Sequence, residues 1–214
     1  MIMKRLFAAA VAAVLFMALG VPAALAQALP PDVLMKQISD DVIESIKQDR
    51  DIQAGDAAKI AALVEAKILP HFDFRRATQI ALGANWRRAT PAQQEELIGH
   101  FRTLLVRTYS GALSSYSGQV IEFSPLRAKP GETEVTVRSR IRQSGAEPIV
   151  IEYDMEEEAS GWKVFDLRIS GISLVATYRS SFAEEIHNNG IDGLIASLAG
   201  KNRRGGAQPV PRKT

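Results

Sequence analysis

The stretch TPAQQEELIGHFRTLLVRTYSGALSSY, residues 90–116, decides the fold class because it predicts one long amphipathic helix. Thr90 is a preferred N-cap residue, and Pro91 takes the first helical position, where an N–H would have no partner. Glu95 and Glu96 lie near the positive end of the helix dipole. The apolar face is broad enough to back an entire sheet, and it holds Leu97, Phe101, Leu104, Leu105, Tyr109, Ala112 and Tyr116.

The apolar period changes from about four residues to two after Gln119, which indicates that helices give way to strands. Four strands are predicted, and polar residues alternate with apolar ones along each of them. The apolar positions are Ile121 and Phe123; Val135, Val137 and Ile141; Ile149, Ile151, Tyr153 and Met155; and Phe165, Leu167 and Ile169. One face of the sheet is therefore apolar and the other wet, which is typical of an antiparallel meander covered by helices on one side.

Further helices are predicted before and after this region. The apolar spacing places them at 32–49, from Asp56 to Pro70, at 74–82, at 174–188 and at 191–198, with Gly190 separating the last two. We therefore predict an α+β fold in which the helices pack on one face of a four-stranded antiparallel sheet, an NTF2-like or cystatin-like arrangement.

The first 26 residues have the pattern of a secretory signal peptide. Lys4 and Arg5 precede an apolar run, and residues 24–26 match the small-residue cleavage site. The alternative is an uncleaved membrane anchor, which the break at Pro22 disfavours. We expect cleavage after Ala26, a soluble mature chain and an exported protein.

Composition and charge set the limits of the mature chain. We expect one domain over residues 27–200 and a disordered basic tail over residues 201–214, which has no apolar periodicity. The chain contains no cysteine, which excludes disulfides and thiol nucleophiles. Residues 27–200 carry 19 basic and 24 acidic side chains, a net charge of minus five, whereas a nucleic-acid binder needs a basic body.

The motifs of common enzyme classes are missing from the chain. There is no G-x-S-x-G, P-loop, H-E-x-x-H or G-x-G-x-x-G pattern. His71, His100 and His187 lie on three different predicted helices, and the acidic run 156–158 is interpreted as a solvated hairpin tip, so no metal site is predicted. Asp166 is the one carboxylate candidate for catalysis, and strand alternation turns it away from its apolar neighbours.

Two blocks of sequence resemble a known family. The first, HFDFRRATQIALGANWRRATPAQQEELIGHFRTLLVRTYSGAL (residues 71–113), contains an Asp turn, a Leu-Gly pair, an Arg-flanked Trp and a long helix ending in Tyr, here Asp73, Leu82-Gly83, Trp86-Arg87 and Tyr109. The second, GWKVFDLRISGISLVATYRSSFAEEIHNNGIDGLIASL (residues 161–198), matches a closing strand and helices. The chain is thereby similar to the MlaC family, also called the toluene-tolerance proteins, over nearly all of residues 32–200.

The resemblance implies a non-catalytic periplasmic carrier that takes a phospholipid between two membranes. Its implied partners are an outer-membrane lipoprotein complex and an inner-membrane ABC transporter with a hexameric lipid-binding subunit. The implied role is the maintenance of outer-membrane lipid asymmetry by a monomer without a cofactor, although a hopanoid remains an alternative cargo. Two other classes stay open: an NTF2-like enzyme acting on a small apolar substrate, and a non-catalytic adaptor of membrane complexes.

A lipid carrier needs only an apolar cavity, and such a cavity produces no compact motif in the sequence. Burying a methylene is worth about 0.8 kcal/mol, so two acyl chains of some thirty methylenes cost roughly 24 kcal/mol to expose to water. We expect the inward sheet positions, the long helix and the last helices to line the pocket, with Arg87 and Arg179 near the headgroup. The predicted lipid-binding residues are Trp86, Leu97, Phe101, Leu104, Leu105, Tyr109, Val135, Val137, Ile149, Ile151, Tyr153, Phe165, Leu167, Ile169, Leu174, Tyr178 and Phe182.

Two sets of these residues carry specific expectations. A bulky aromatic at Val137 or Ile151 is expected to displace lipid more than it lowers stability, because a cavity accepts volume that a packed core rejects. Tyr109 and Tyr178 lie on apolar stripes of two different helices. They are interpreted either as core tyrosines or as residues at the pocket mouth, since a buried hydroxyl needs a partner.

Overall fold

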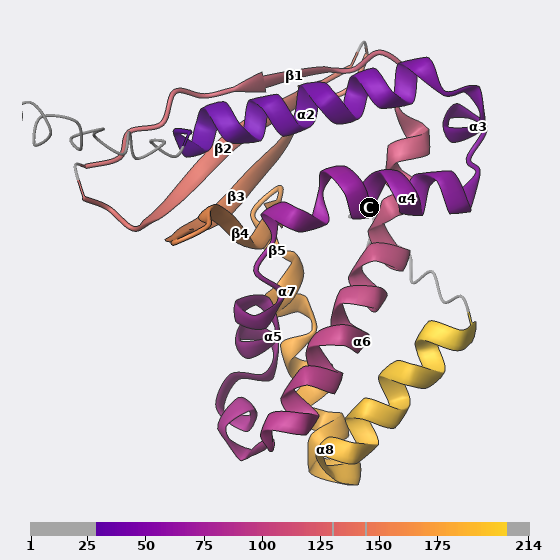
Figure 1. The fold of residues 1–214 in the computed structure, drawn as a ribbon, viewed down its shortest axis with the longest axis vertical. Helices are drawn as coiled ribbons and strands as arrows, with labels where there is room; N and C mark the ends of the chain where they lie inside the picture. The colour runs from indigo at the N-terminus through magenta and orange to yellow at the C-terminus, as the bar shows by residue number, and fades with distance from the viewer. Residues whose placement is uncertain (1–28, 130, 144, 205–214) are drawn as a thin grey trace, which may run out of the picture.

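A computed structural model of the chain describes residues 29–129, 131–143 and 145–204 (Figure 1). The predicted signal peptide, residues 1–26, lies outside these ranges. The helices are α2 (Pro31–Gln48), α3 (Arg50–Gln53), α4 (Ala57–Lys67), α5 (Phe74–Leu82), α6 (Pro91–Tyr109), α7 (Leu174–Thr177) and α8 (Arg179–Arg204), with 3-10 turns η1 (Leu69–His71), η2 (Gly83–Arg88) and η3 (Ser110–Ser115). Within the described residues, every helix is too short or too polar to span a bilayer.

The helices begin and end where local chemistry predicts. The side chain of Asp56 accepts hydrogen bonds from the amides of Ala58 and Lys59, both at 2.9 Å, and so caps α4. Thr90 accepts from the amide of Gln93 at 3.2 Å, and the Gln93 side chain bonds back to the Thr90 amide, which makes a capping box at the start of α6.

The sheet has five strands in the order β1-β2-β3-β4-β5, and all neighbours are antiparallel. The strands are β1 (Val120–Phe123), β2 (Glu134–Arg142), β3 (Ile149–Glu158), β4 (Gly161–Ile169) and β5 (Ile172–Ser173). The predicted α+β class is confirmed. The predicted count of four strands is wrong, because β5 is only two residues long and shows no alternation.

A β-bulge in β4 changes which side chains share a face. Met155 of β3 pairs with Val164, whereas the adjacent Asp154 pairs with Asp166, so Phe165 is an extra residue on β4. The predicted alternation of Phe165 with Leu167 is therefore broken: Leu167 lies in phase with Val164 instead. The sequence could not show this change of face, because a bulge does not alter the apolar pattern of the residues around it.

Two separate cores divide the molecule into lobes. In the sheet lobe, α2 and α4 cover one face of the sheet, and the core includes Ile38, Val42, Ile46, Val137, Met155, Trp162 and Val164. In the helical lobe, α5, α6, α7 and α8 pack around Leu97, Phe101, Leu104, Phe182, Ile186 and Leu198. Figure 1 shows α6 running away from the sheet beside α8, so the expectation that this helix backs the sheet is wrong.

The last helix bends at Gly190, where the backbone has φ 73° and ψ −177°. A positive φ suits glycine, which explains the predicted break there. The helix continues to Arg204, past the predicted domain end at Gly200, because it is bonded to α6. The Asn202 side chain donates to the His100 carbonyl at 3.0 Å, and Arg107 donates to the Asn202 carbonyl at 2.5 Å. The remaining residues of the predicted tail, 205–214, lie outside the described residues.

Candidate functional site: an apolar cleft between the lobes

A cleft of about 190 Å³ lies where the two lobes meet. Segments far apart in the chain form its wall: α4 with η1, the start of α5, the end of α6 with η3, the bulge of β4, and α7. The lining residues are Val64, Ile68, Leu69, Phe72, Phe74, Ala77, Leu105, Val106, Tyr109, Ser110, Leu113, Phe165, Asp166, Leu167, Leu174 and Val175. This interlobe cleft is lined almost entirely by apolar side chains.

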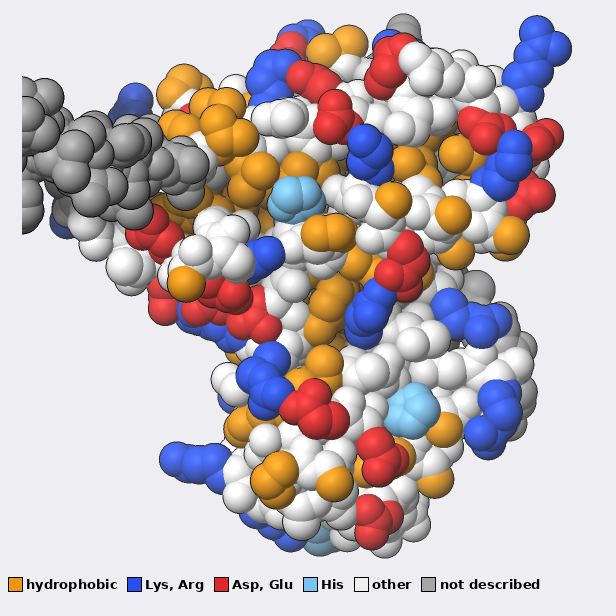
Figure 2. Space-filling model, in the orientation of Figure 1, with side chains coloured by type: hydrophobic (Ala, Val, Ile, Leu, Met, Phe, Trp, Pro, Cys, Tyr) orange, Lys and Arg blue, Asp and Glu red, His pale blue; other side chains and the backbone are white. Residues whose placement is uncertain are grey.

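The apolar wall reaches the surface of the molecule. Figure 2 shows hydrophobic side chains gathered between the upper and lower halves, in the region where Figure 1 places α4, α5 and α6. An apolar surface between polar flanks marks a binding groove more often than an isolated exposed side chain does. The interlobe cleft is therefore the candidate site for an apolar ligand.

The cleft brings together five of the predicted lipid-binding residues. Leu105 and Tyr109 come from α6, Phe165 and Leu167 from β4, and Leu174 from α7. Leu105 and Leu167 are 62 positions apart in the sequence, yet both form part of one wall. The predicted meeting of the long helix with the sheet thus occurs at one end of α6 only.

Six other predicted residues belong to the helical core rather than to the cleft lining. Leu97, Phe101, Leu104 and Phe182 are buried there, and Trp86 and Tyr178 pack against it. The predicted helix face was correct, but it faces α5 and α8 instead of the sheet. Apolar periodicity identifies a buried face without identifying its partner.

The predicted residues of the sheet divide between core and surface. Val135, Val137 and Tyr153 belong to the sheet core, where Val137 is 1% exposed. Ile151 and Ile169 are half-buried and pair directly across β3 and β4. Ile149 is 42% exposed at the start of β3. None of these six is among the residues that line the described cleft.

The two predicted tyrosines are neighbours, but only Tyr109 is among the residues that line the described cleft. Tyr109 lines the cleft, whereas the ring of Tyr178 lies edge-on to Phe101, with centroids 5.2 Å apart at 78°. Burial raises the pKa of Tyr109 above its ordinary value, and the neighbouring Tyr178 raises it further. Tyr109 thus presents a protonated hydroxyl close to the apolar wall.

The two arginines predicted for the headgroup lie away from the cleft. The Arg179 guanidinium packs against Gly83 at the far end of α5. Arg87 precedes α6, and about 21 Å of helix, at 1.5 Å per residue, separates Pro91 from Leu105 in the cleft wall. Neither side chain reaches the cleft lining.

Asp166 is a cleft residue that the sequence did not place there. Its backbone pairs with Asp154, on the face opposite Leu167, yet it lines the cleft and is only 8% exposed. Its carboxylate accepts hydrogen bonds from the Leu167 amide at 2.8 Å, the Val175 amide at 3.2 Å and the Ser173 hydroxyl at 2.5 Å. Burial raises its pKa. These three hydrogen bonds hold α7 against β4. They favour a structural role for the Asp166 carboxylate over a role in proton transfer.

The other missed residues are the apolar positions of α4, η1 and the start of α5, including Val64, Ile68 and Phe74. They lie within the predicted helical segments 56–70 and 74–82. The sequence contains no signal that these residues border a cleft. Apolar residues beside a void follow the same periodicity as apolar residues in a packed interface.

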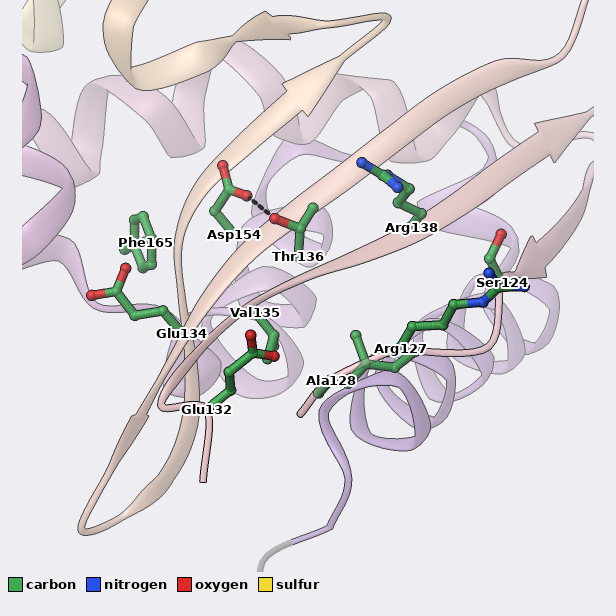
Figure 3. A pocket seen from close by; sticks show the side chains of 11 residues that line it. Ser124, Arg127, Ala128, Glu132, Glu134, Val135, Thr136, Arg138, Asp154 and Phe165 are labelled. Atoms are coloured by element: carbon green, nitrogen blue, oxygen red, sulfur yellow. Dashed lines mark hydrogen bonds between the residues drawn. The ribbon is translucent and has the colours of Figure 1, made fainter. Parts of the chain in front are cut away.

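A second hollow lies beside β2 and is lined by charged groups (Figure 3). It has a volume of about 380 Å³ and lies between β2 and the segment 124–128. Arg127, Arg138, Glu132, Glu134 and Asp154 contribute to its wall, and the Thr136 hydroxyl donates to Asp154 at 2.7 Å. Although this hollow is larger than the interlobe cleft, acyl chains placed in it would desolvate several charges.

One group of acids among the described residues could approach a cation. Oxygens of Asp73, Glu156 and Glu158 lie within 4.8 Å of one another. Arg76 already forms ion pairs with Glu156 and Glu134. The arginine thus neutralises one of the three acids of this cluster, Glu156.

Comparisons with known proteins add an independent finding. A family model described as MlaC protein matches residues 36–200. The intermembrane phospholipid transport system binding protein MlaC of Haemophilus influenzae is 24% identical over 183 residues, which cover 84% of each chain. Toluene tolerance protein ttg2D of Pseudomonas putida is 28% identical over 132 residues, 60% of this chain and 61% of that one.

A solved structure is similar in both sequence and fold. The phospholipid-binding protein from Ralstonia solanacearum, determined in complex with a phospholipid, is 40% identical to this chain, with a TM-score of 0.75. The match covers 81% of this chain and 97% of that one. It therefore includes parts of both lobes.

Proposed function

Since the chain belongs to the MlaC family, we propose that it binds a phospholipid in the interlobe cleft and carries it through the periplasm. The family resemblance of the two sequence blocks is confirmed by the match over residues 36–200. Support for the cargo comes from the phospholipid bound to the similar Ralstonia protein.

The observation that carries the proposal is the position of the cleft between two cores. Widening the cleft would separate the lobes without opening either core. The described cleft, at about 190 Å³, is below the roughly 300–1,000 Å³ of typical ligand pockets. A lipid-bound form must therefore be wider, and acyl chains would replace contacts between the lobes with contacts of the same apolar kind.

The proposed route follows from the family. The carrier would receive lipid from one membrane complex and deliver it to another, between an outer-membrane lipoprotein complex and an inner-membrane ABC transporter with its hexameric lipid-binding subunit. We propose that it acts there as a monomer and without catalysis, after cleavage near Ala26, and that it helps to maintain outer-membrane lipid asymmetry. We propose a single lipid-binding domain over residues 27–200, and α8 itself continues to Arg204.

Two adjacent leucines of α6 provide a matched test of the cleft. Leu105 lines the cleft, whereas Leu104 is 7% exposed in the helical core. Leu105→Trp should fill the cleft and sharply reduce copurified phospholipid with little loss of stability. Leu104→Trp should cost about 1–3 kcal/mol by overpacking but leave the lipid content of the folded protein unchanged. The measurements are mass spectrometry of extracted lipid per mole of protein and urea unfolding after lipid removal.

Two outcomes would contradict the proposal at different levels. A full lipid complement in Leu105→Trp would show that the chains lie elsewhere. A wild-type protein that neither copurifies with phospholipid nor transfers it between liposomes would remove the carrier function itself.

A further inference from the structure

An ion pair joins the two lobes beside the interlobe cleft. Arg102 of α6, in the helical lobe, pairs with Glu65 of α4, in the sheet lobe. Glu65 directly follows Val64 of the cleft wall, and Arg102 lies three residues before Leu105, on the same side of α6. The Arg102 guanidinium also lies 5.9 Å from the ring centroid of Phe74, another residue of the wall.

The pair is poorly suited to holding the lobes together. The side chains of Arg102 and Glu65 are 40% and 57% exposed. Exposed ion pairs of this kind contribute little to stability, because water screens them and both side chains lose freedom. Another anion could therefore replace Glu65 with little loss to the protein.

The described residues include two arginines that lie over aromatic rings of the cleft wall. Arg76 lies 3.7 Å from the ring centroid of Phe165, but two carboxylates, Glu134 and Glu156, already neutralise it, and it is only 24% exposed. Arg102 has a single exposed carboxylate among the described ion pairs. It is therefore the more available cation beside the cleft.

We propose that Arg102 binds the phosphate of the lipid headgroup, and that Glu65 occupies Arg102 when the cleft is empty. This inference rests on the proposed function. A charged phosphate stays at the rim because its burial without partners is costly, whereas the chains enter the apolar interior. The planar guanidinium can bind two phosphate oxygens at once, and Phe74 separates this contact from the chains.

The replacement of Glu65 by the lipid phosphate at Arg102 has a consequence for cargo selection. A diacyl lipid that bears a phosphate should bind better than a diacylglycerol with the same chains, and the difference should depend on Arg102. Glu65 competes with the phosphate, so removing its charge should strengthen binding.

The test neutralises each partner alone. Binding to lipid-free protein is measured for a fluorescent phosphatidylglycerol and for the diacylglycerol with the same chains, both delivered from cyclodextrin. Arg102→Gln should weaken phosphatidylglycerol binding about tenfold, equivalent to about 1.4 kcal/mol, and leave diacylglycerol binding unchanged. Glu65→Gln should strengthen phosphatidylglycerol binding about threefold, within the range of an exposed ion pair.

Arg75→Gln is the matched control. Arg75 forms an exposed ion pair with Glu95 and lies 6.0 Å from the ring centroid of Trp86, which is not a residue of the cleft wall, so it repeats the surroundings of Arg102 over a different ring. Binding of both lipids to this variant should equal that of the wild type.

The outcomes separate the possible roles of the pair. If the ion pair only held the two lobes together, Arg102→Gln and Glu65→Gln would change the binding of both lipids in the same direction. That result would overturn the inference. Equal phosphatidylglycerol binding by wild type and Arg102→Gln would also overturn it, as would Arg102-dependent binding of inorganic phosphate alone, which would indicate a free-anion site. A wild-type protein that binds neither lipid would instead contradict the proposed function.

Discussion

The Asp166 carboxylate accepts a hydrogen bond from the Val175 amide at 3.2 Å and thereby joins β4 to α7 in the wall of the interlobe cleft. Asp166→Ala removes this acceptor and leaves the Ser173 hydroxyl and two amides without their partner. We expect a loss of about 2–3 kcal/mol, since buried donors that lose their partner destabilise the folded state. Urea unfolding measures the loss, and the isosteric Asp166→Asn should cost less. An unchanged midpoint for Asp166→Ala would contradict this role.

Glu152 should make folding more favourable at neutral than at acidic pH. Its carboxylate accepts from Arg138 at 2.7 Å and from Arg168 at 3.0 Å, and these contacts hold its pKa below the ordinary value. A lowered pKa in the folded state contributes stability above the ordinary pKa, and this stability is lost as the pH falls through the lowered value. Glu152→Gln should therefore cost about 1 kcal/mol at neutral pH, typical of a partly exposed charged hydrogen bond.

The measurement is urea unfolding of wild type and Glu152→Gln at about pH 7 and about pH 3. The difference between the two proteins should narrow at the lower pH, where the wild-type carboxylate becomes protonated. A constant difference at both values would show that the charge of Glu152 is not responsible.

An aromatic substitution at Val137 should lower stability rather than lipid content, which reverses the expectation from sequence. Val137 is 1% exposed within the sheet core and is separate from the cleft lining. Val137→Phe should cost about 1–3 kcal/mol by overpacking. Ile151→Phe, at a half-buried position, should cost less. Thermal unfolding and lipid extraction measure the two effects, and lipid loss by a fully stable Val137→Phe protein would argue for a cavity at this position.

The two tyrosines should respond differently to removal of their hydroxyls. Tyr109→Phe changes the cleft wall, so lipid transfer between liposomes should slow while stability changes by less than about 1 kcal/mol. Tyr178→Phe keeps the ring beside Phe101 and Phe182 and removes a hydroxyl that neighbours Tyr109 without lining the cleft, so transfer should slow less than in Tyr109→Phe. Slower transfer in Tyr178→Phe alone would show that the functional hydroxyl belongs to Tyr178 and not to Tyr109.

Two truncations test where the folded unit ends. Residues 205–214 have no apolar periodicity, so their removal should leave the melting temperature unchanged. Removing residues 201–214 also deletes the hydrogen bonds of Asn202 with His100 and Arg107 and should cost about 1–2 kcal/mol. Equal melting temperatures for both truncations would place the end of the unit at Gly200, as the sequence predicts.

Features that depend on near neighbours in the chain were predictable from sequence. The caps at Asp56 and Thr90, the end of α5 at Gly83 and the bend at Gly190 all involve residues within a few positions of one another. Helical and strand periods identified the buried faces and the α+β class, and the two sequence blocks identified the family. These signals are local because capping, backbone conformation and alternation are set over one or two turns.

Only the tertiary structure decided where those faces meet. The separation of the two cores and the pairing of Glu65 with Arg102 depend on segments far apart in the chain, and the bulge that displaces Phe165 depends on the pairing of β4 with β3. A cleft is the absence of packing between such segments, and an apolar residue beside a void has the same sequence pattern as one inside a core. The sequence therefore determined which side chains are apolar and buried, and the packing of the two lobes determined which of them border a space for a ligand.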